Sequence, residues 1–361
     1  MLKICVIGNE YMQQFPVLGY GGIEGYVQNL CVGIDKNFKD KINFCVFVPK
    51  ILDKKETNFN FNIIEVDFIE NSKSGQHRLV FAEKVAKIIK ESKQKPDIIW
   101  AQSPWSVNYL SDLGIPMIVS VYDSMGWELF KDDMKLINKD NVYYRFLSNF
   151  HFNNILKDAD INPLVNDVKS KSFWCYTGMT DDEYSLEIEK ENYILWVAGF
   201  NFYGMEGKGL DIFLKLATML PEENFVVYGS GDHSIESYLT DFQRKVKNFE
   251  YRGPLARGKE HKKAFSKSKL FTLLSQWPES FARTGLEAIT KGTPLLTSTK
   301  GSNPEIYSSI ATCTDDLNNM AEAILRPYNY NEIFLHAKKF HVNNEIETLY
   351  NKSLEILYYN N

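Results

Sequence analysis

Short runs of β-branched and other apolar residues alternate along the chain with segments whose apolar residues follow a helical spacing. In the first half these runs are Ile4–Ile7, Phe44–Val48, Ile63–Val66, Ile98–Ala101 and Met117–Val121. In the second half they are Ile194–Ala198, Phe225–Tyr228, Leu270–Leu274 and Pro294–Thr297. Several runs are apolar on both faces, as strands covered by helices on both sides are. Alternating strands and helices predict a parallel sheet, and two such series predict two doubly wound α/β domains.

Helical spacing is clearest in Val80–Lys90, Leu210–Leu220 and Asn344–Tyr358. An aromatic stretch, Val142–Leu156, leaves two interpretations open, a membrane-facing helix and core packing. Core packing is favoured because the stretch has no Lys- and Arg-rich polar face. We therefore expect peripheral membrane contact at most.

The length of 361 residues favours two domains over one. The seam is expected within Lys169–Asn192, which is polar and acidic around Thr180–Glu183 before an apolar strand begins again. This predicts an N-terminal domain of residues 1–170 and a C-terminal domain of residues 171–340.

Charge and cysteine content narrow the class of protein. Lys and Arg number 41 against 46 Asp and Glu, and a net charge of -5 argues against a nucleic-acid-binding protein. No apolar run approaches the 18 or so residues of a spanning helix, and Met1–Gly8 lacks the layout of a signal peptide. The 5 cysteines include no CxxC pair, and the 6 histidines show no metal-binding spacing. We expect a cytoplasmic protein without a metal or other cofactor, and its oligomeric state stays open.

Glycine-rich turns follow the first strand of each half. Gly19–Glu24 precedes a helical segment, but Glu24 stands where the third glycine of a dinucleotide fingerprint would be. In Gly204–Leu210, Lys208 lies at a helix start, which is the unfavourable end for a cation unless an anion also docks there. Both turns are open to a phosphate-binding or a plain surface interpretation, and the position of Lys208 favours a phosphate.

Two glutamates mark the clearest chemistry in the segment Glu279–Ala288. Glu279 and Glu287 lie eight residues apart and bracket an expected helix start, so both are placed to face one pocket. A carboxylate accepts two hydrogen bonds from a vicinal diol, as in a ribose or a sugar ring. The alternative is that Glu279 complements the helix dipole and Glu287 faces solvent. Amides at the helix start can receive phosphate oxygens, which makes donor-binding candidates of Ser280, Phe281, Ala282, Arg283 and Thr284.

The ordered set of motifs resembles the retaining GT-B glycosyltransferases of glycosyltransferase family 4, also called glycosyl transferases group 1. The motifs are the Gly-Gly-Ile-Glu turn at 21–24, Lys-Gly at 208–209, Tyr-Gly-Ser-Gly-Asp at 228–232, Tyr-Arg-Gly at 251–253, Glu-x7-Glu at 279–287, Gly-Thr-Pro at 292–294, and Gly301 with Pro-Glu-Ile at 304–306. The resemblance implies two Rossmann-like domains facing across a cleft, with the C-terminal helix, residues 341–361, joining the first domain. It also implies transfer of a sugar from a nucleotide-diphosphate donor with retention and without a metal.

The resemblance further implies roles for individual residues. Glu287 would bind the donor ribose and Glu279 the donor sugar, while Lys208 would neutralise the diphosphate. Gly21 and Gly22 would let the donor phosphate or the acceptor approach. The donor is expected to be a UDP-sugar, and the acceptor is left open between a glycan and a lipid-linked glycan.

Two positions depart from the family pattern. The family's Arg after the strand at 195–198 is absent, since the chain reads Ala198-Gly199-Phe200-Asn201 there, and Arg283 is a candidate substitute or a surface ion-pair partner. The family's His after the strand at 117–121 is replaced by Tyr122-Asp123. Tyr122 is a poor general base near neutral pH, so Asp123 or the donor phosphate would take the acceptor proton.

Other functions stay open beside the transferase. A nucleotide-sugar epimerase would share the fold, and a weakly active nucleotide-sugar-binding relative would explain the missing Arg and His. A dehydrogenase ranks last because no dinucleotide fingerprint follows any strand.

Overall fold

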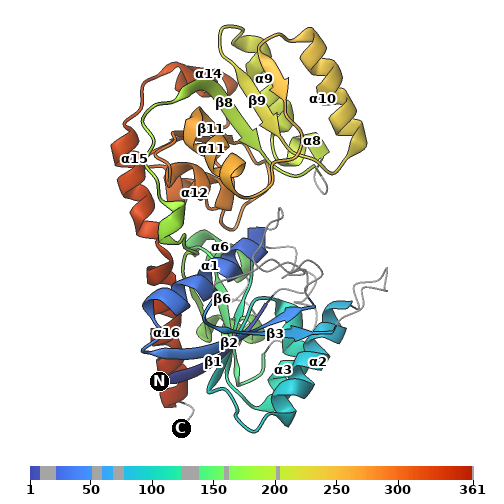
Figure 1. Cartoon of the computed structure of the whole chain (residues 1–361), viewed down its shortest axis with the longest axis vertical. Helices are drawn as coiled ribbons and strands as arrows, with labels where there is room; N and C mark the ends of the chain where they lie inside the picture. Colours follow the sequence, from blue (N-terminus) through green and yellow to red (C-terminus); the bar gives the residue numbers. More distant parts are fainter. Residues whose placement is uncertain are drawn as a thin grey trace. The chain divides into compact units, whose positions relative to one another are not determined.

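The computed structural model describes residues 1–8, 22–50, 59–67, 77–122, 138–157, 162–200 and 204–359. They fall into two units, each built on a parallel sheet with helices on both faces (Figure 1). The first unit comprises the described residues up to Thr180 and those from His341 onward, and the second comprises Asp181–Phe340. The predicted pair of doubly wound α/β sheets is thereby confirmed.

The sheet of the first unit has the strand order β3-β2-β1-β4-β5-β6-β7, and all its pairings are parallel. Its strands are β1 (Leu2–Ile7), β2 (Ile42–Pro49), β3 (Asn62–Val66), β4 (Ile98–Ala101), β5 (Met117–Ser120), β6 (Val142–Phe146) and β7 (Ser172–Trp174). Its helices are α1 (Gly22–Asn37), α2 (His77–Glu91), α3 (Val107–Leu110), α6 (Asn149–Ile155), α7 (Pro163–Ser170) and α16 (Val342–Tyr359).

Two apolar cores cover the two faces of this first sheet. α2, α3 and α7 pack on one face, and α1 and α16 on the other. α1 and α16 approach so closely that a β-carbon at Gly33 would lie 2.7 Å from the side chain of Ile346. The indole N–H of Trp100, on β4, donates to Ser353 of α16 at 3.0 Å, so this buried polar group is hydrogen-bonded.

The sheet of the second unit has the order β10-β9-β8-β11-β12-β13, again with parallel pairings. Its strands are β8 (Glu191–Val197), β9 (Phe225–Tyr228), β10 (Phe249–Tyr251), β11 (Ser268–Leu273), β12 (Leu295–Thr297) and β13 (Thr312–Cys313). Its helices are α8 (Gly204–Gly207), α9 (Leu210–Met219), α10 (His233–Lys245), α11 (Lys259–Lys267), α12 (Arg283–Ile289), α13 (Asn303–Tyr307), α14 (Leu317–Leu325) and α15 (Tyr330–Ala337). α9, α10 and α14 share one apolar core with the strands.

The first unit extends about ten residues beyond the predicted boundary at 170. β7 pairs with β6, so it belongs to the first sheet. The segment after it is tied to α16, because the Gly178 amide donates to a Glu345 carboxylate oxygen at 2.7 Å. The other oxygen of Glu345 lies 2.8 Å from the Arg145 guanidinium in a fully buried ion pair. The boundary therefore falls at Thr180, after this buried anchor.

The aromatic stretch at 142–156 is not one helix. Val142–Phe146 is strand β6, buried between its neighbours, and only Asn149–Ile155 is helical, as α6. Its rings pack within the first unit, as the contact of Phe146 with Phe152 at 5.9 Å shows. Of the two interpretations, the structure supports core packing.

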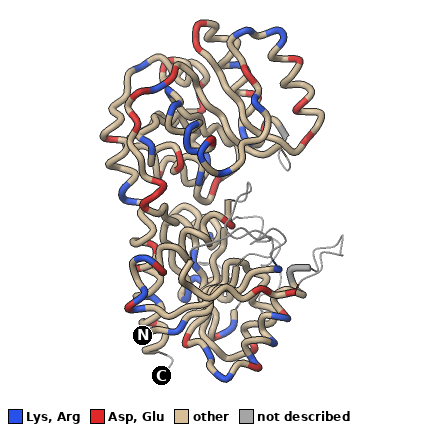
Figure 2. Tube along the Cα trace, in the orientation of Figure 1, with Lys and Arg blue, Asp and Glu red and all other residues tan. Residues whose placement is uncertain are grey.

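Basic and acidic positions are mixed over both units (Figure 2), in keeping with the small net charge. Over the described ranges, none of the helices combines the length and the apolar character needed to cross a bilayer.

Candidate active site

Each sheet has a point at which its strand order reverses. In the first sheet it lies between β1 and β4, and in the second between β8 and β11. Ligands of open α/β sheets bind beyond the carboxyl ends of the strands at such a point. Lys208 follows β8 and Glu279 follows β11, so these two residues reach the reversal point of the second sheet from its two sides.

The main chain at Lys208 is fixed by the strands beneath it. The indole N–H of Trp196, on β8, donates to the Lys208 carbonyl oxygen at 3.1 Å. The next residue, Gly209, has φ of 69°, and a β-carbon there would lie 2.1 Å from the Leu274 carbonyl oxygen. A side chain at Gly209 would therefore push the loop off the end of β11. This packing places Lys208 directly before Gly209, the N-cap residue of α9.

Glu279 is held by contacts to both its side chain and its main chain. Its Oε1 atom lies 2.5 Å from Lys208 Nζ and accepts a hydrogen bond from the Ser275 hydroxyl at 2.7 Å. The Ser302 amide donates to the Glu279 carbonyl at 2.9 Å. A β-carbon at Gly301 would lie 2.3 Å from the Glu279 backbone, so glycine is needed for this approach. The loops after β8 and β11 thus meet at the Glu279 carboxylate, and the loop after β12 holds the Glu279 main chain.

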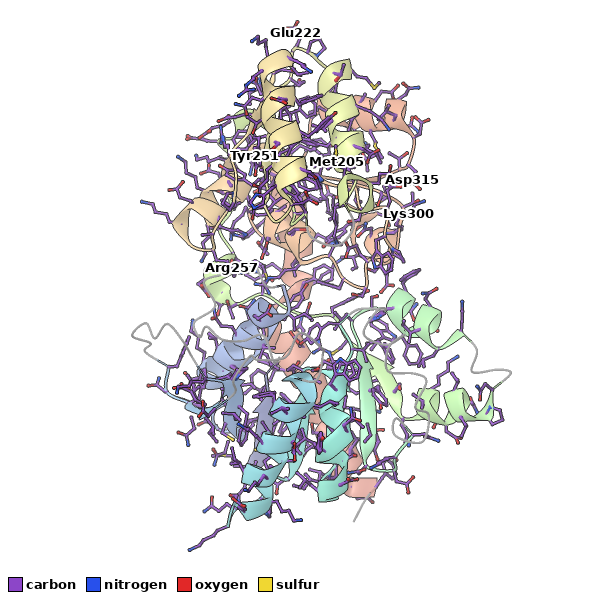
Figure 3. All side chains as sticks on the ribbon, turned by 90° about the vertical axis from the view of Figure 1, so that its right-hand side faces the viewer. Met205, Glu222, Tyr251, Arg257, Lys300 and Asp315 are labelled. Atoms are coloured by element: carbon purple, nitrogen blue, oxygen red, sulfur yellow. The ribbon has the colours of Figure 1, made fainter. Side chains whose placement is uncertain are left out.

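Glu287 lies on α12, is 4% exposed, and is surrounded by basic side chains. Arg283 Nε donates to its Oε1 atom at 2.8 Å, and Arg257 Nη1 donates to the same oxygen at 3.2 Å. His261 Nε2 lies 3.5 Å from Oε2. Figure 3 shows Arg257 at the end of the second unit opposite Glu222, which precedes β9, so Arg257 lies at the carboxyl edge of the sheet.

The electrostatics of this cluster keep Glu287 ionised. Burial alone would raise the pKa of Glu287, but Arg283, Arg257 and His261 outweigh it and hold the pKa below its usual value. Burial lowers the pKa of His261, and the attraction of Glu287 offsets this only in part. At neutral pH the cluster therefore combines one carboxylate with two guanidinium groups.

The structure separates the two glutamates by their partners. Glu279 pairs with Lys208, whereas Glu287 pairs with Arg283, Arg257 and His261. Arg283 was predicted as a substitute cation or a surface ion-pair partner. It is 6% exposed, so its ion pair with Glu287 is buried rather than superficial.

The remaining predicted donor residues of this segment form the approach to α12. They are Ser280, Phe281, Ala282 and Thr284. Ala282 is the N-cap residue of α12, and its carbonyl accepts a hydrogen bond from the Tyr307 hydroxyl at 2.9 Å. The ring of Phe281 contacts that of Phe340, with centroids 5.9 Å apart. Ser280 and Thr284 are half-buried. Their contacts with a donor stay predictions.

Aromatic packing occupies the position at which the resemblance implied an arginine. Phe200 is 2% exposed and stacks on Trp196, with ring centroids 6.1 Å apart. A β-carbon at Gly229 would lie 2.6 Å from the Phe200 ring, so the segment directly after β9 packs against this ring. Phe200 is therefore part of the core and leaves Lys208 as the basic residue that follows β8.

In the first unit, Tyr122 lies beyond the carboxyl end of β5. Its hydroxyl donates to Gln102 Oε1 at 2.6 Å, and its ring stacks on Tyr26 of α1 at 5.9 Å. Burial raises the pKa of Tyr122 well above its usual value. The hydroxyl therefore stays protonated at neutral pH and serves as a hydrogen-bond donor, which removes it as a general base.

The glycine turn is described only from Gly22, the first residue of α1. Gly22 is exposed, and a β-carbon there would meet no described atom within 4 Å. Gly21 and Asp123 lie outside the described residues, and their roles stay predictions.

Four residues of these two regions were not found from the sequence: Gln102, Arg257, His261 and Ser275. Ser275 directly follows an apolar run and precedes Glu279 by four residues, so its position in the sequence could have indicated a place in the site. Arg257 reaches Glu287 from 30 residues away, and no spacing rule predicts such a contact. Within the described ranges, no group of three or more His, Cys, Asp or Glu side chains is arranged to hold a metal ion.

Comparison with known proteins gives a family match for part of the chain and a fold for the whole of it. Residues 191–329 match the family Glycosyl transferases group 1, whereas no curated protein matches the sequence. The chain is similar to sucrose-phosphate synthase from Thermosynechococcus elongatus, with 13% identity, a TM-score of 0.74 and 100% of each chain covered. It is also similar to the catalytic domain of starch synthase IV from Arabidopsis thaliana bound to ADP and acarbose, with 12% identity, a TM-score of 0.71 and 99% of each chain covered.

A third similar structure is that of Anabaena HepE in complex with UDP-glucose. The identity is 13%, the TM-score is 0.67, and 98% of this chain and 100% of that chain are covered. At such identities the similarity establishes the fold alone. The chain thus has the GT-B fold, and its residues 191–329 match the model of the family Glycosyl transferases group 1.

Proposed function

We propose that this chain is a retaining glycosyltransferase that moves a sugar from a UDP-sugar to a glycan or a lipid-linked glycan. The observation that carries the proposal is the pair of Lys208 and Glu279 at the reversal point of the second sheet. A cation and a carboxylate side by side suit a ligand that has both a diphosphate and sugar hydroxyls. The UDP-glucose and ADP bound to two proteins of this fold support a nucleotide donor.

Lys208 would neutralise the charge that develops on the departing nucleoside diphosphate. Such stabilisation is a principal electrostatic task in group transfer. Because Phe200 is buried in the core, the strand end that precedes Lys208 supplies no second cation. Replacing Lys208 should therefore remove a large share of the leaving-group stabilisation.

Glu287 would accept the two hydroxyls of the donor ribose. Its Oε1 atom already accepts hydrogen bonds from two arginines, whereas Oε2 faces His261 at 3.5 Å, beyond a short hydrogen bond. An ionised carboxylate offers about four lone-pair positions. Oε2 thus retains the capacity to accept hydroxyl groups while the arginines hold the carboxylate in place.

The donor phosphate would take the acceptor proton. The acceptor oxygen bonds to the anomeric carbon, the bond from that carbon to the phosphate oxygen breaks, and the acceptor proton passes to a phosphate oxygen. Protonated Tyr122 cannot serve as the base, which favours this route, with Asp123 as the other candidate.

A thermal-shift screen with UDP-, ADP- and GDP-glucose tests donor binding, since a ligand that binds only the folded state raises the unfolding temperature. We expect UDP-glucose to raise it most for the wild type. The shift should be lost in Lys208→Met and kept in Lys300→Met. Lys300 is the matched control because it pairs with Asp315 at 3.0 Å (Figure 3) and follows β12 in the same unit.

Product analysis then separates the activities. Incubation with UDP-glucose and a glycan panel should release UDP and form a product with the anomeric configuration of the donor. Conversion of the UDP-sugar without an acceptor would instead identify an epimerase. Binding with neither transfer nor hydrolysis would identify an inactive nucleotide-sugar-binding protein, and no shift with any of the three donors would refute the proposal.

A further inference from the structure

The contacts of Glu279 place two donors on a single carboxylate oxygen. Lys208 Nζ and the Ser275 hydroxyl both reach Oε1, at 2.5 and 2.7 Å. The two donors differ in exposure, because Ser275 is 1% exposed whereas the side chain of Lys208 is 29% exposed. Solvent and ligands therefore reach the lysine, while the serine contact lies within the protein.

The main chains on both sides of this contact are fixed independently of it. The Gln276 amide donates to the Gly207 carbonyl at 3.0 Å, which joins the loop of Lys208 to the loop of Glu279. The Ser298 hydroxyl donates to the Ser275 carbonyl at 2.6 Å and secures the serine. Lys208 can therefore leave the carboxylate by a change of side-chain rotamer, with no movement of the backbone.

The proposed donor makes opposing demands on these two side chains. Its diphosphate requires the charge of Lys208, and the carboxylate of Glu279 would then stand as an anion close to another anion. Like charges at short range repel, and a carboxylate that loses its cation needs other donors. Ser275 and the hydroxyls of the donor sugar are the donors that the geometry offers.

We propose that Lys208 is exchanged between Glu279 and the donor diphosphate, and that Ser275 is the positioning residue that holds the released carboxylate. This inference rests on the proposed function. With the whole donor bound, the sugar hydroxyls satisfy Glu279. Once the sugar has been transferred, the carboxylate lacks those partners and competes again for Lys208. Glu279 therefore discriminates against the free nucleoside diphosphate and promotes its release.

Calorimetric titration of UDP, ADP, GDP and their glucose conjugates into wild type and Glu279→Gln tests the exchange. The amide keeps the shape of the side chain and removes its charge. A partly exposed ion pair corresponds to a roughly two- to fivefold change in an equilibrium constant. We expect Glu279→Gln to bind the preferred nucleoside diphosphate tighter by about that factor and to lose the preference for the UDP-sugar over UDP. Asp315→Asn, which breaks the Lys300 pair after β12, is the matched control and should leave both affinities unchanged.

The outcomes separate the inference from the function on which it rests. Equal or weaker nucleotide binding by Glu279→Gln, with normal binding by the wild type, overturns the exchange and leaves the proposed function standing. Failure of the wild type to bind any of the three nucleotides or their glucose conjugates overturns both. If Asp315→Asn raised the affinity for the nucleotide as much as Glu279→Gln does, the effect would come from net charge alone. That result would also overturn the exchange.

Kinetics of Ser275→Ala test the positioning residue. We expect kcat to fall by about tenfold, while the affinity for UDP and the unfolding temperature stay close to those of the wild type. Ser275→Thr keeps the hydroxyl and should restore much of kcat. A normal kcat in Ser275→Ala, or a loss that only parallels a loss of stability, would remove the positioning role.

Discussion

Glu279 and Glu287 lie eight residues apart in one segment, yet their surroundings differ. The side chain of Glu279 is 16% exposed and pairs with one lysine that is itself accessible. The side chain of Glu287 is 5% exposed, and its arginine partners are also largely buried. The same chemical group is thus exchangeable at one position and fixed at the other.

The difference follows from the elements that carry the partners. Lys208 reaches Glu279 on a flexible four-carbon stem, and an ammonium group is a point charge with rotatable donors. Arg283 lies one turn before Glu287 on the same helix, so α12 itself holds that contact. A guanidinium is planar and loses less freedom for each hydrogen bond it forms. The carboxylate of Glu287 is therefore held in place before a ligand binds, whereas that of Glu279 can change its partner when a ligand binds.

The largest expected effect is on stability after removal of the buried carboxylate. Glu287→Ala removes the carboxylate that Arg283 and Arg257 share in the buried cluster, a change that costs about 3–5 kcal/mol. Glu279→Ala leaves a partly exposed lysine and should cost about 1 kcal/mol or less. In a unit of this size the first change lowers the unfolding midpoint by roughly 10 °C and the second by a few degrees, as calorimetry would measure. Equal losses in the two variants would end the distinction between the two sites.

The sequence predicted the strands whose pattern depends on neighbouring residues, and it failed where a strand depends on a partner from a distant part of the chain. The strand prediction at Phe225–Tyr228 agrees with β9 at both ends, because an apolar run between helices is a local signal. β6 was not predicted as a strand, because the charged residue Arg145 interrupts its apolar run. Arg145 forms a buried ion pair with Glu345 of α16, and no local sequence pattern predicts that contact.

The candidate site shows the same limit. Lys208 and Glu279 were predicted from glycine context and spacing, and the structure brings them into contact. Their mutual pairing was not predicted, because it depends on β8 and β11 being neighbours in the sheet. The pairing of Arg283 with Glu287 could have been predicted from the sequence, since residues four apart on a helix lie on the same face. Arg257 and His261 come from β10–α11 and required the fold.

A smaller effect is expected from pH at the buried site. The pKa of His261 is lowered in the folded protein, mainly by burial, so below about pH 6.5 the unfolded chain binds a proton that the folded chain does not. Stability is therefore lost as pH falls, with a slope of at most about 1.4 kcal/mol per pH unit from this residue. Unfolding midpoints of wild type and His261→Gln between about pH 7.5 and 5.5 measure it. The variant should decline less steeply, and parallel curves would show that His261 does not contribute.

The smallest expected effect concerns salt at the accessible site. Lys208→Met should lower stability by about 1 kcal/mol or less at low ionic strength, because a partly exposed ion pair contributes little. The Debye length falls from about 30 Å at 0.01 M to about 3 Å at 1 M, so concentrated salt should erase most of this difference. The penalty of Glu287→Ala should persist in the same salt, since buried charges are screened much less. Unfolding midpoints of both variants at the two ionic strengths measure the contrast. A Lys208→Met penalty that survives 1 M salt would place Glu279 in the same class as Glu287 and remove the basis for an exchangeable lysine.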